Sequence, residues 1–441
     1  MQGKYTIFSD NIYYKYTVME KIEPKILKGT RDFLPEDMAK RLLIMGKIRR
    51  IFERFGYDAI ETPVICPAET ILGKYGGEGE KLTYNFRDAG DRWIALPFDL
   101  TVPFARLVAA NWRDLPMPFK RYQIQRVWRA EKPQKGRLRE FYQCDIDIIG
   151  TKSLIAEAEI AKIMVEVFKE LGFINFIIKV NSRRLLNEIL DSYKIPKEQS
   201  LEVIRTIDKL DKVGEQAVIE MLEEIGIKKA KDLMKLLKPE KDNKSTFRKV
   251  SKFNIKEIDT FFKYCEKFDI PEKYLQFDPS LARGLDYYTG ISYEVVSNDF
   301  NFGTLCAGGR YDNLCGLFCN EDFSGVGVAF GFERIVLALQ EMNELENVGL
   351  NSQVLVTLFD KKSINDSLSI YSELIEAGIN SEVYFESDKL AKQFKYANKK
   401  QIPYVIVCGP DEAKNDEVTI KEMKTGKQET IHRDQMVSHL K

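Results

Sequence analysis

Apolar and polar residues repeat along the first part of this chain in patterns that predict helices and strands. Apolar positions at 41/42, 44/45, 48, 51, 52 and 55 follow helical spacing and predict a helix over 38–55. Residues 59–65, 119–131 and 140–149 have the pattern of strands, and 153–171 that of an amphipathic helix. Residues 94–110 are expected to begin extended and to become helical after Pro103.

The pattern changes at about residue 183. Residues 183–272 are rich in Lys and Glu, have helical periodicity and contain no glycine motif, which favours an inserted helical module. Strand-like sequence with glycine clusters returns at 275–331. After a plausible linker, strands at 353–359, 381–385, 403–408 and 417–423 alternate with helices near 364–377 and 388–400. This alternation predicts a small α/β domain.

Composition excludes several kinds of chemistry. The 67 basic and 67 acidic side chains cancel, so contact with nucleic acid must depend on local basic patches. The chain has two histidines, His432 and His439, which argues against a Ser/His/Asp triad or a metal site of several His ligands. The seven scattered cysteines are interpreted as reduced thiols, with no resident metal expected. A cytoplasmic protein is expected from these reduced thiols, and no apolar run is long enough for a membrane span.

A pair of strands joined by a basic loop is the first candidate for chemistry. Along 140–149, Tyr142, Cys144, Ile146 and Ile148 share one face, and Gln143, Asp145 and Asp147 share the other. The joining loop carries Lys132, Lys135, Arg137 and Arg139 around Gly136. Such a platform with a basic tip suits a polyphosphate or the end of a nucleic acid. The alternative is an ordinary amphipathic hairpin with a solvated turn.

Three glycine-containing peptides are further candidates. LARGLDYYTG (281–290) places Arg283 beside two tyrosines, and TLCAGGRYDNL (304–314) contains Gly308-Gly309, where a backbone could approach a ligand closely. GVGVAFGFERIVLAL (325–339) has glycines along a strand that precedes a helix with Glu333 and Arg334 at its start. The alternatives are, in order, a turn with tyrosines packed in the core, a hairpin turn, and a tightly packed strand–helix turn.

Taken in this order, the peptides resemble the histidyl-tRNA synthetases. Arg129 with Glu131 is similar to motif 2 of class II synthetases, FGFERIVLAL to motif 3, and the helix before Pro63 to motif 1. LARGLDYYTG and CAGGRYDNL are similar to two peptides of that family, and KGTRDFLPEDM and FDLTVPFARLV match as well. The resemblance extends from about residue 25 to the C-terminus.

The resemblance implies an α+β fold and a division into domains. A class II antiparallel sheet with flanking helices would carry a helical insertion, followed by a C-terminal α/β anticodon-binding domain. The implied limits are an N-terminal extension (1–24), catalytic parts (25–182 and 273–342), the insertion (183–272), a linker (343–352) and the anticodon-binding domain (353–441).

The resemblance also implies a pocket for L-histidine. Asp99 and Thr101 would receive the α-amino group, and Tyr287 and Tyr288 would close around the imidazole. The whole predicted pocket is formed by Asp99, Thr101, Arg129, Gln143, Asp147, Arg283, Tyr287 and Tyr288.

ATP with Mg²⁺ is the implied second substrate. The catalytic residues would be Arg129, which binds the α-phosphate and the substrate carboxylate, and Arg283, which stabilises the α-phosphate during attack. Glu131 would lie at the adenine end, Arg137 at the outer phosphates and Arg334 against the tail of ATP.

The implied macromolecular partners are tRNA(His) and a second copy of the chain in a homodimer formed through motif 1. The residues expected to contact tRNA are Gln134, Lys135, Lys392, Lys395 and Lys399. A solvated helix face is the alternative interpretation of the three C-terminal lysines.

Two other functions fit the same resemblance. A paralogue that serves as a regulatory subunit of histidine biosynthesis would keep the fold without charging tRNA, but such proteins lose the anticodon domain and erode the motifs. A sensor that binds tRNA without chemistry would typically lie within a longer chain. Exchange of pyrophosphate with ATP in the presence of histidine distinguishes these functions from a ligase.

Overall fold

An eight-stranded, mostly antiparallel sheet is the centre of the molecule in this computed structural model, which describes residues 21–441 except 74–75, 285–286, 301–302 and 346–347. Most of the predicted N-terminal extension therefore lies outside the described residues. In spatial order the strands are β1 (Asp58–Ala59), β5 (Phe119–Trp128), β6 (Glu140–Ile149), β11 (Gly325–Gly331), β10 (Cys306–Tyr311), β9 (Ile291–Ser297), β7 (Phe176–Ser182) and β8 (Leu275–Phe277).

Parallel pairing occurs only at the two edges of this sheet, where β1 joins β5 and β8 joins β7. The six strands between them are antiparallel neighbours. The expected α+β fold with an antiparallel sheet is confirmed. A separate three-stranded sheet, β2 (Cys66–Pro67), β4 (Trp93–Ala95) and β3 (Asn85–Arg87), contacts the short helix α2 (Ala68–Ile71).

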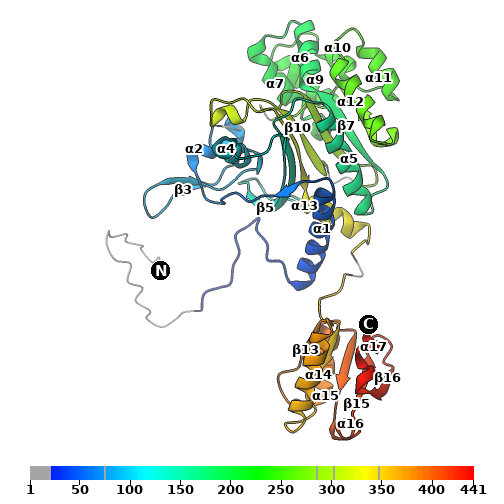
Figure 1. Cartoon of the computed structure of the whole chain (residues 1–441). Coiled ribbons are helices and arrows are strands. Elements are labelled where there is room, and N and C mark those ends of the chain that lie inside the picture. Colours follow the sequence, from blue (N-terminus) through cyan, green and yellow to red (C-terminus); the bar gives the residue numbers. More distant parts are fainter. Residues whose placement is uncertain (1–20, 74–75, 285–286, 301–302, 346–347) are drawn as a thin grey trace.

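The helices of this part flank the sheet (Figure 1). They are α1 (Pro35–Arg54), α2 (Ala68–Ile71), α3 (Gly76–Lys81), α4 (Thr101–Asn111), α5 (Ile155–Glu170) and α13 (Phe332–Glu341), with a 3-10 turn at Cys315–Leu317. In α1, Pro35 and two acidic residues stand in the first turn and Ile44, Ile48, Ile51 and Phe52 form the buried stripe. Their packing with α5 against one face of the sheet makes the main core.

Helices fill residues 183–267 and gather at one end of the sheet (Figure 1). They are α6 (Arg183–Ser192), α7 (Lys197–Ile207), α8 (Leu210–Val213), α9 (Glu215–Glu224), α10 (Ala230–Leu237), α11 (Asn243–Val250) and α12 (Lys256–Lys267), followed by a 3-10 turn at Glu272–Tyr274. Ser182 starts the first of them, since its hydroxyl accepts the backbone N–H groups of Arg184 and Leu185.

The C-terminal part is an α/β unit joined to the rest by one connecting segment (Figure 1). Its sheet has the order β13 (Ser381–Val383), β12 (Val354–Val356), β14 (Tyr404–Val407), β15 (Glu417–Glu422) and β16 (Gln428–His432). Its helices are α14 (Ile364–Glu376), α15 (Leu390–Lys399), α16 (Pro410–Asn415) and α17 (Met436–Leu440), with a 3-10 turn at Arg433–Gln435. This unit has hydrophobic cores of its own.

Several local predictions were wrong at their boundaries. Of the strand expected over 59–65, broken by Pro63, only Ala59 lies in a ladder, because β1 spans Asp58–Ala59. The helix α4 begins at Thr101 rather than after Pro103, since a proline is tolerated in the first helical turn. Strands β7 and β16 were not predicted.

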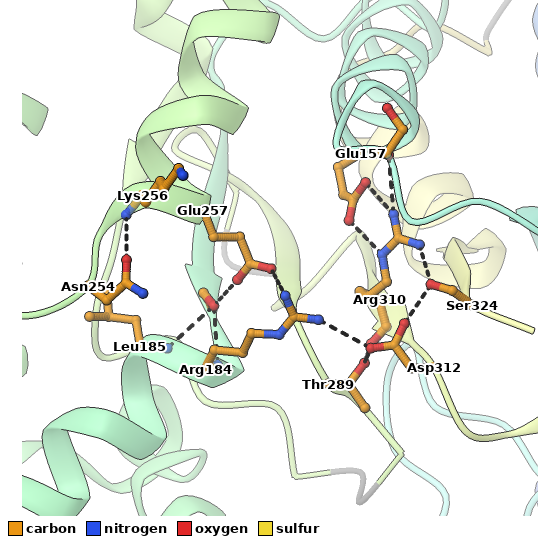
Figure 2. Close-up of polar contacts among 12 residues, drawn as sticks. Glu157, Arg184, Leu185, Asn254, Lys256, Glu257, Thr289, Arg310, Asp312 and Ser324 are labelled. Carbon is orange, nitrogen blue, oxygen red and sulfur yellow. Dashed lines mark hydrogen bonds and ion pairs between the residues drawn. The ribbon is translucent and has the colours of Figure 1, made fainter. Parts of the chain in front are cut away.

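A network of charged side chains, buried at Arg310 and Glu157 and exposed at Arg184, connects α5, strand β10 and helices α6 and α12 (Figure 2). The Arg310 guanidinium donates to Glu157 Oε1 and Oε2 at 2.7 and 2.5 Å, and to Ser324 Oγ at 2.7 Å. Asp312 accepts from Ser324 and from Arg184 on α6, whose guanidinium also donates to Glu257 on α12. The network thereby ties the helical part of the chain to the central sheet.

The pair Arg310–Glu157 is expected to matter for stability, because its side chains are 4% and 1% exposed. The change Arg310→Met leaves the Glu157 carboxylate buried without its charge partner, which should lower the free energy of unfolding by about 3–5 kcal/mol. Urea denaturation measures this. The control is Lys263→Met on α12, which removes an exposed pair with Asp259 and should cost less than about 1 kcal/mol. If both variants lost equally little unfolding free energy, the stabilising role of the pair Arg310–Glu157 would be contradicted.

Candidate active site

A large cleft of about 1470 Å³ covers one face of the central sheet and reaches helices α7 and α8. Every residue predicted to bind histidine or ATP lines it: Asp99, Thr101, Arg129, Glu131, Arg137, Gln143, Asp147, Arg283, Tyr287, Tyr288 and Arg334. They come from segments up to 235 positions apart in the chain, between 99 and 334. The fold therefore brings the predicted residues into one site.

The floor of the cleft is the polar face of β6. Asp147 is 2% exposed and both of its oxygens have partners: Arg121 Nη2 lies 2.6 Å from Oδ2, and the Tyr311 hydroxyl donates to Oδ1 at 2.6 Å. Arg121 faces Asp147 across the pairing of β5 with β6. These two contacts hold the Asp147 carboxylate in one orientation.

Burial changes the acidity of this floor. It raises the pKa of Asp147 to about 6, although the charge of Arg121 and the hydrogen bond from Tyr311 both act to lower it. Burial also raises the pKa of Asp145 well above its usual value; there Arg121 acts to lower it, and the neighbouring Asp147 and Asp99 raise it further. Closely spaced carboxylates in a buried site favour a cationic or proton-donating ligand.

A glycine makes room for Asp147. Gly327 on β11 pairs with Asp147, and a Cβ at position 327 would lie 2.0 Å from Asp147 Oδ1 and 2.6 Å from the backbone oxygen of Ile146. A side chain at position 327 would therefore displace the Asp147 carboxylate. The glycine run in β11 is needed for the shape of the floor.

Guanidinium groups gather at the other end of the floor, near Gln143. Arg129 lies over the Phe98 ring, 4.4 Å from its centroid, and its Nε donates to the Phe98 carbonyl at 3.0 Å. Arg137 and Glu131 form an ion pair of 2.8 Å. The Arg334 guanidinium donates to the Thr304 carbonyl at 2.7 Å, while burial and the charge of Arg137 lower its pKa. This end is suited to a polyanion.

Arg283 lies in the segment that follows β8, next to the two tyrosines. Its Nη1 is 3.6 Å from Glu294 Oε2, and Arg183 donates to its backbone carbonyl at 2.5 Å. The rings of Tyr287 and Tyr288 are 4.8 Å apart between centroids. Residues 285–286 of the predicted LARGLDYYTG peptide lie outside the described residues, so the structure places only its two ends.

The residues predicted to contact tRNA do not all share the cleft. Gln134 lines it, while the exposed Lys135 on the same loop pairs with Glu341 at 2.7 Å. Lys392, Lys395 and Lys399 lie on α15, where their spacing places them on one exposed face. Lys392 pairs there with Asp388 at 2.7 Å.

Two details of the sequence interpretation were wrong. The alternative of a hairpin turn at Gly308-Gly309 was wrong, because both lie inside strand β10, where a Cβ on Gly308 would meet the backbone of β11 at 2.0 Å. Arg129 and Glu131 were expected within a strand, but β5 ends at Trp128. Their backbone belongs to the loop, which is held by a hydrogen bond from Arg129 N to Arg139 O.

The sequence matches the family described as histidyl-tRNA synthetase over residues 29–335, and the family described as anticodon binding domain over residues 353–441. The chain belongs to the histidyl-tRNA synthetase family. It is 38% identical to the histidine–tRNA ligase of Clostridium tetani, over 95% of this chain and 98% of that protein. It is 39% identical to that of Cytophaga hutchinsonii, over 96% and 100%.

Solved structures support membership of the histidyl-tRNA synthetase family. The enzyme from Nostoc sp. PCC 7120 is similar with a TM-score of 0.84 and 30% identity, over 95% of this chain and 99% of that one. An ATP phosphoribosyltransferase regulatory subunit/histidyl-tRNA synthetase from Bacillus halodurans shares the fold, with a TM-score of 0.73, 21% identity and coverage of 88% and 99%. As in the sequence-based expectation, the described part of the chain has no helix with the length and apolarity to cross a membrane.

Sequence reasoning did not identify three residues that hold buried carboxylates in this histidyl-tRNA synthetase fold: Arg121, Tyr311 and Arg310. Arg121 stands in a strand whose polar face was expected to bear charges, so the alternation could have identified it. Tyr311 and Arg310 are part of the GGRYD peptide, but nothing local indicates that one contacts Asp147 and the other Glu157.

The requirement for a bare strand opposite Asp147 can be tested with Gly327→Ala. The added Cβ would meet a carboxylate oxygen and backbone, so the variant should lose about 1–3 kcal/mol of unfolding free energy. Gly46→Ala in helix α1 is the control, since its Cβ would meet nothing closer than 3.8 Å. It should gain roughly 0.5–1 kcal/mol. Denaturant titration of both proteins measures the two changes in unfolding free energy, which should have opposite signs. If Gly327→Ala left the unfolding free energy unchanged, the steric argument would be refuted.

Proposed function

We propose that this chain, a histidine–tRNA ligase of the family above, activates L-histidine with ATP in the cleft and passes the histidyl group to tRNA(His). The observation that carries this assignment is the polarity of the cleft. Carboxylates and tyrosines, with Arg283 beside the tyrosines, line one end of its floor, and Arg129, Arg137 and Arg334 line the other. An amino acid and a polyphosphate can therefore lie end to end with their reacting groups in contact.

ATP would occupy the guanidinium end as its Mg²⁺ complex. Arg129 would bind the α-phosphate, Arg137 the outer phosphates and Arg334 the tail, with Glu131 at the adenine. Mg²⁺ would be held largely by the phosphates, where it would neutralise part of their charge, because the described residues contain no group of three His, Cys, Asp or Glu side chains suited to a metal. Phe98 and Phe141, whose rings flank the Arg129 guanidinium, would add apolar walls to this end.

Histidine would occupy the carboxylate end. Asp99 and Thr101 stand at the start of α4, where Asp99 Oδ1 accepts the Val102 N–H at 3.1 Å, and they would receive the α-amino group. Asp147 would accept from an imidazole nitrogen, with Gln143 on the same face of β6 and with Tyr287 and Tyr288 closing the pocket. Because Arg121 and Tyr311 hold Asp147 in one orientation, an amino acid without a donor at the matching place would not gain this hydrogen bond.

The first chemical step would be attack by a histidine carboxylate oxygen on the α-phosphorus of ATP. A bond forms between that oxygen and phosphorus, the bond to the bridging oxygen breaks, and pyrophosphate leaves with the electron pair. No general base is needed, because the carboxylate is already ionised. Arg129 and Arg283 would stabilise charge on the α-phosphate, which explains how the chain can work with two histidines, both far from the cleft in sequence.

The second step would use the terminal hydroxyl of tRNA(His) as the nucleophile on the histidyl carbonyl, with AMP leaving. Gln134 and Lys135 at the mouth of the cleft would contact the acceptor end. The exposed face of α15 with Lys392, Lys395 and Lys399 would contact the anticodon region, in keeping with the match of this part to anticodon-binding domains.

A homodimer through motif 1 is part of the proposal, as are the domain limits stated above. Helix α1 buries Ile44 and Ile48, but its other side exposes Leu42 and Leu43, which are 59% and 40% accessible. Such exposed leucines are suited to an interface with a second copy.

The decisive experiment is exchange of pyrophosphate with ATP in the presence of single amino acids. The reversal of adenylate formation should require L-histidine, because the floor offers acceptors matched to imidazole and ammonium donors. A regulatory subunit would show no exchange. Equal exchange with a second amino acid would contradict the assignment of the histidine pocket.

Arg283 is expected to act mainly on the transition state. It lies in the cleft close to Glu294, and in the described structure its Nε has no hydrogen-bond partner, which leaves it a donor for the α-phosphate. Arg283→Ala should slow adenylate formation by about 10²–10³-fold with little change in the affinities for ATP and histidine. Arg283→Lys should not restore the rate, because one ammonium lacks the planar fork. Near wild-type single-turnover rates at saturation would make Arg283 a structural residue instead.

A further inference from the structure

Two buried oxygen atoms on the floor of the cleft lack hydrogen-bond partners within the described structure: Gln143 Oε1 and Asp145 Oδ1. The two side chains are 8% and 2% exposed, and both line the cleft. They stand two residues apart on β6, so they point to the same face. A buried acceptor without a donor is costly, which indicates that a ligand supplies the missing donors.

The neighbours of Asp145 in the described sheet donate no hydrogen bond to its Oδ1. Across β5 its partner is Gln123, whose amide group donates to Thr62 and Gln125. Across β11 its partner is Ala329, which has no polar side chain. Arg121 on β5 forms its ion pair with Asp147, and although its Nε has no hydrogen-bond partner within the described structure, Arg121 donates no hydrogen bond to Asp145 Oδ1. Asp145 is therefore the carboxylate of the floor that the sheet itself does not satisfy.

The charges of this end of the cleft point to a cationic ligand group. Asp99, Asp145 and Asp147 all line it, each 5% exposed or less, and Arg121 neutralises Asp147. An ammonium group carries a positive charge and three N–H donors, so it can serve a carboxylate and an amide oxygen together. A neutral imidazole has one N–H and could satisfy one of the two acceptors.

The order of residues along β6 matches the order of groups along the substrate. Gln143 is next to the guanidinium end, Asp147 is at the tyrosine end, and Asp145 lies midway, about 6–7 Å from each along the strand. An amino acid with its imidazole at Asp147 and its carboxylate toward Arg129 has its α-carbon between them. Its α-ammonium group then lies over Asp145.

We infer that Asp145 is a substrate-binding residue that, next to Gln143, accepts a charge-assisted hydrogen bond from the α-ammonium group of histidine. The inference rests on the proposed function and adds a second carboxylate to the site that holds Asp99. Asp145 thereby selects for an amino acid over an imidazole compound that lacks the amino group.

The test measures by calorimetry how tightly two ligands bind to three full-length proteins. The proteins are the unaltered chain, Asp145→Asn and Asp147→Asn. The ligands are L-histidine and imidazolepropionate, which is histidine without its α-amino group. In Asp145→Asn the affinity for histidine should fall about 10- to 100-fold, as expected for loss of a charged acceptor, while that for imidazolepropionate stays nearly unchanged. Asp147→Asn, the neighbouring carboxylate on the same face, should weaken both ligands by a similar factor.

The inference is overturned if Asp145→Asn weakens both ligands equally, since Asp145 would then only shape the sheet. It is overturned as well if neither affinity changes. Circular dichroism and ATP binding check that the variant is folded, and Asp145→Ala, which removes both oxygens, is expected to shift the ligand preference in the same direction. Pyrophosphate exchange by the unaltered protein is measured first, and if histidine supports no exchange, the proposed function fails. If exchange occurs but the Asp145 variants keep the ligand preference of the unaltered protein, only the role inferred for Asp145 is refuted.

Discussion

Burying the Asp147 carboxylate on the floor of the sheet requires a glycine opposite it on the neighbouring strand, and the rest of this site depends on that constraint. Gly327 on β11 faces Asp147, and Gly331 faces Gln143. A Cβ at 327 would overlap the Asp147 oxygen, so the strand must be bare for the carboxylate to turn toward Arg121 and Tyr311. The lack of side-chain atoms at Gly327 and Gly331 also leaves the space that the substrate would fill.

Paired charges then keep this open floor rigid. Arg121 with Asp147, Arg310 with Glu157 and Arg41 with Glu333 are ion pairs whose members are almost inaccessible to water. The last two pairs join elements distant in sequence, and the network around Arg310 reaches as far as Arg184 on α6 (Figure 2). A preorganised set of charges is what adenylate formation needs, because the chemistry consists of aligning two substrates and stabilising charge on phosphate.

Local pattern predicted much of this architecture for physical reasons. The alternation along β6 separated Cys144 and Ile146, which face the core, from Asp145 and Asp147, which face the cleft, because successive side chains of a strand point to opposite sides. The amphipathic stripe of α5 was equally clear. The short strands β1 and β16 were misjudged or missed, since two to five residues that are almost all exposed carry little periodic signal.

The sequence by itself determined the family, through the peptides around Arg129, Arg283, Gly308 and Arg334, and the kinds of side chain available for the chemistry. Only the tertiary structure decided which carboxylate receives which partner. Tyr311 reaches Asp147 across 164 positions, and Arg310 reaches Glu157 across 153. Both contacts depend on strand order and register, which bring distant residues together and which no local pattern contains. For the same reason Asp145 and Asp147 look alike in the sequence, yet the sheet satisfies one and leaves an oxygen of the other open to the cleft.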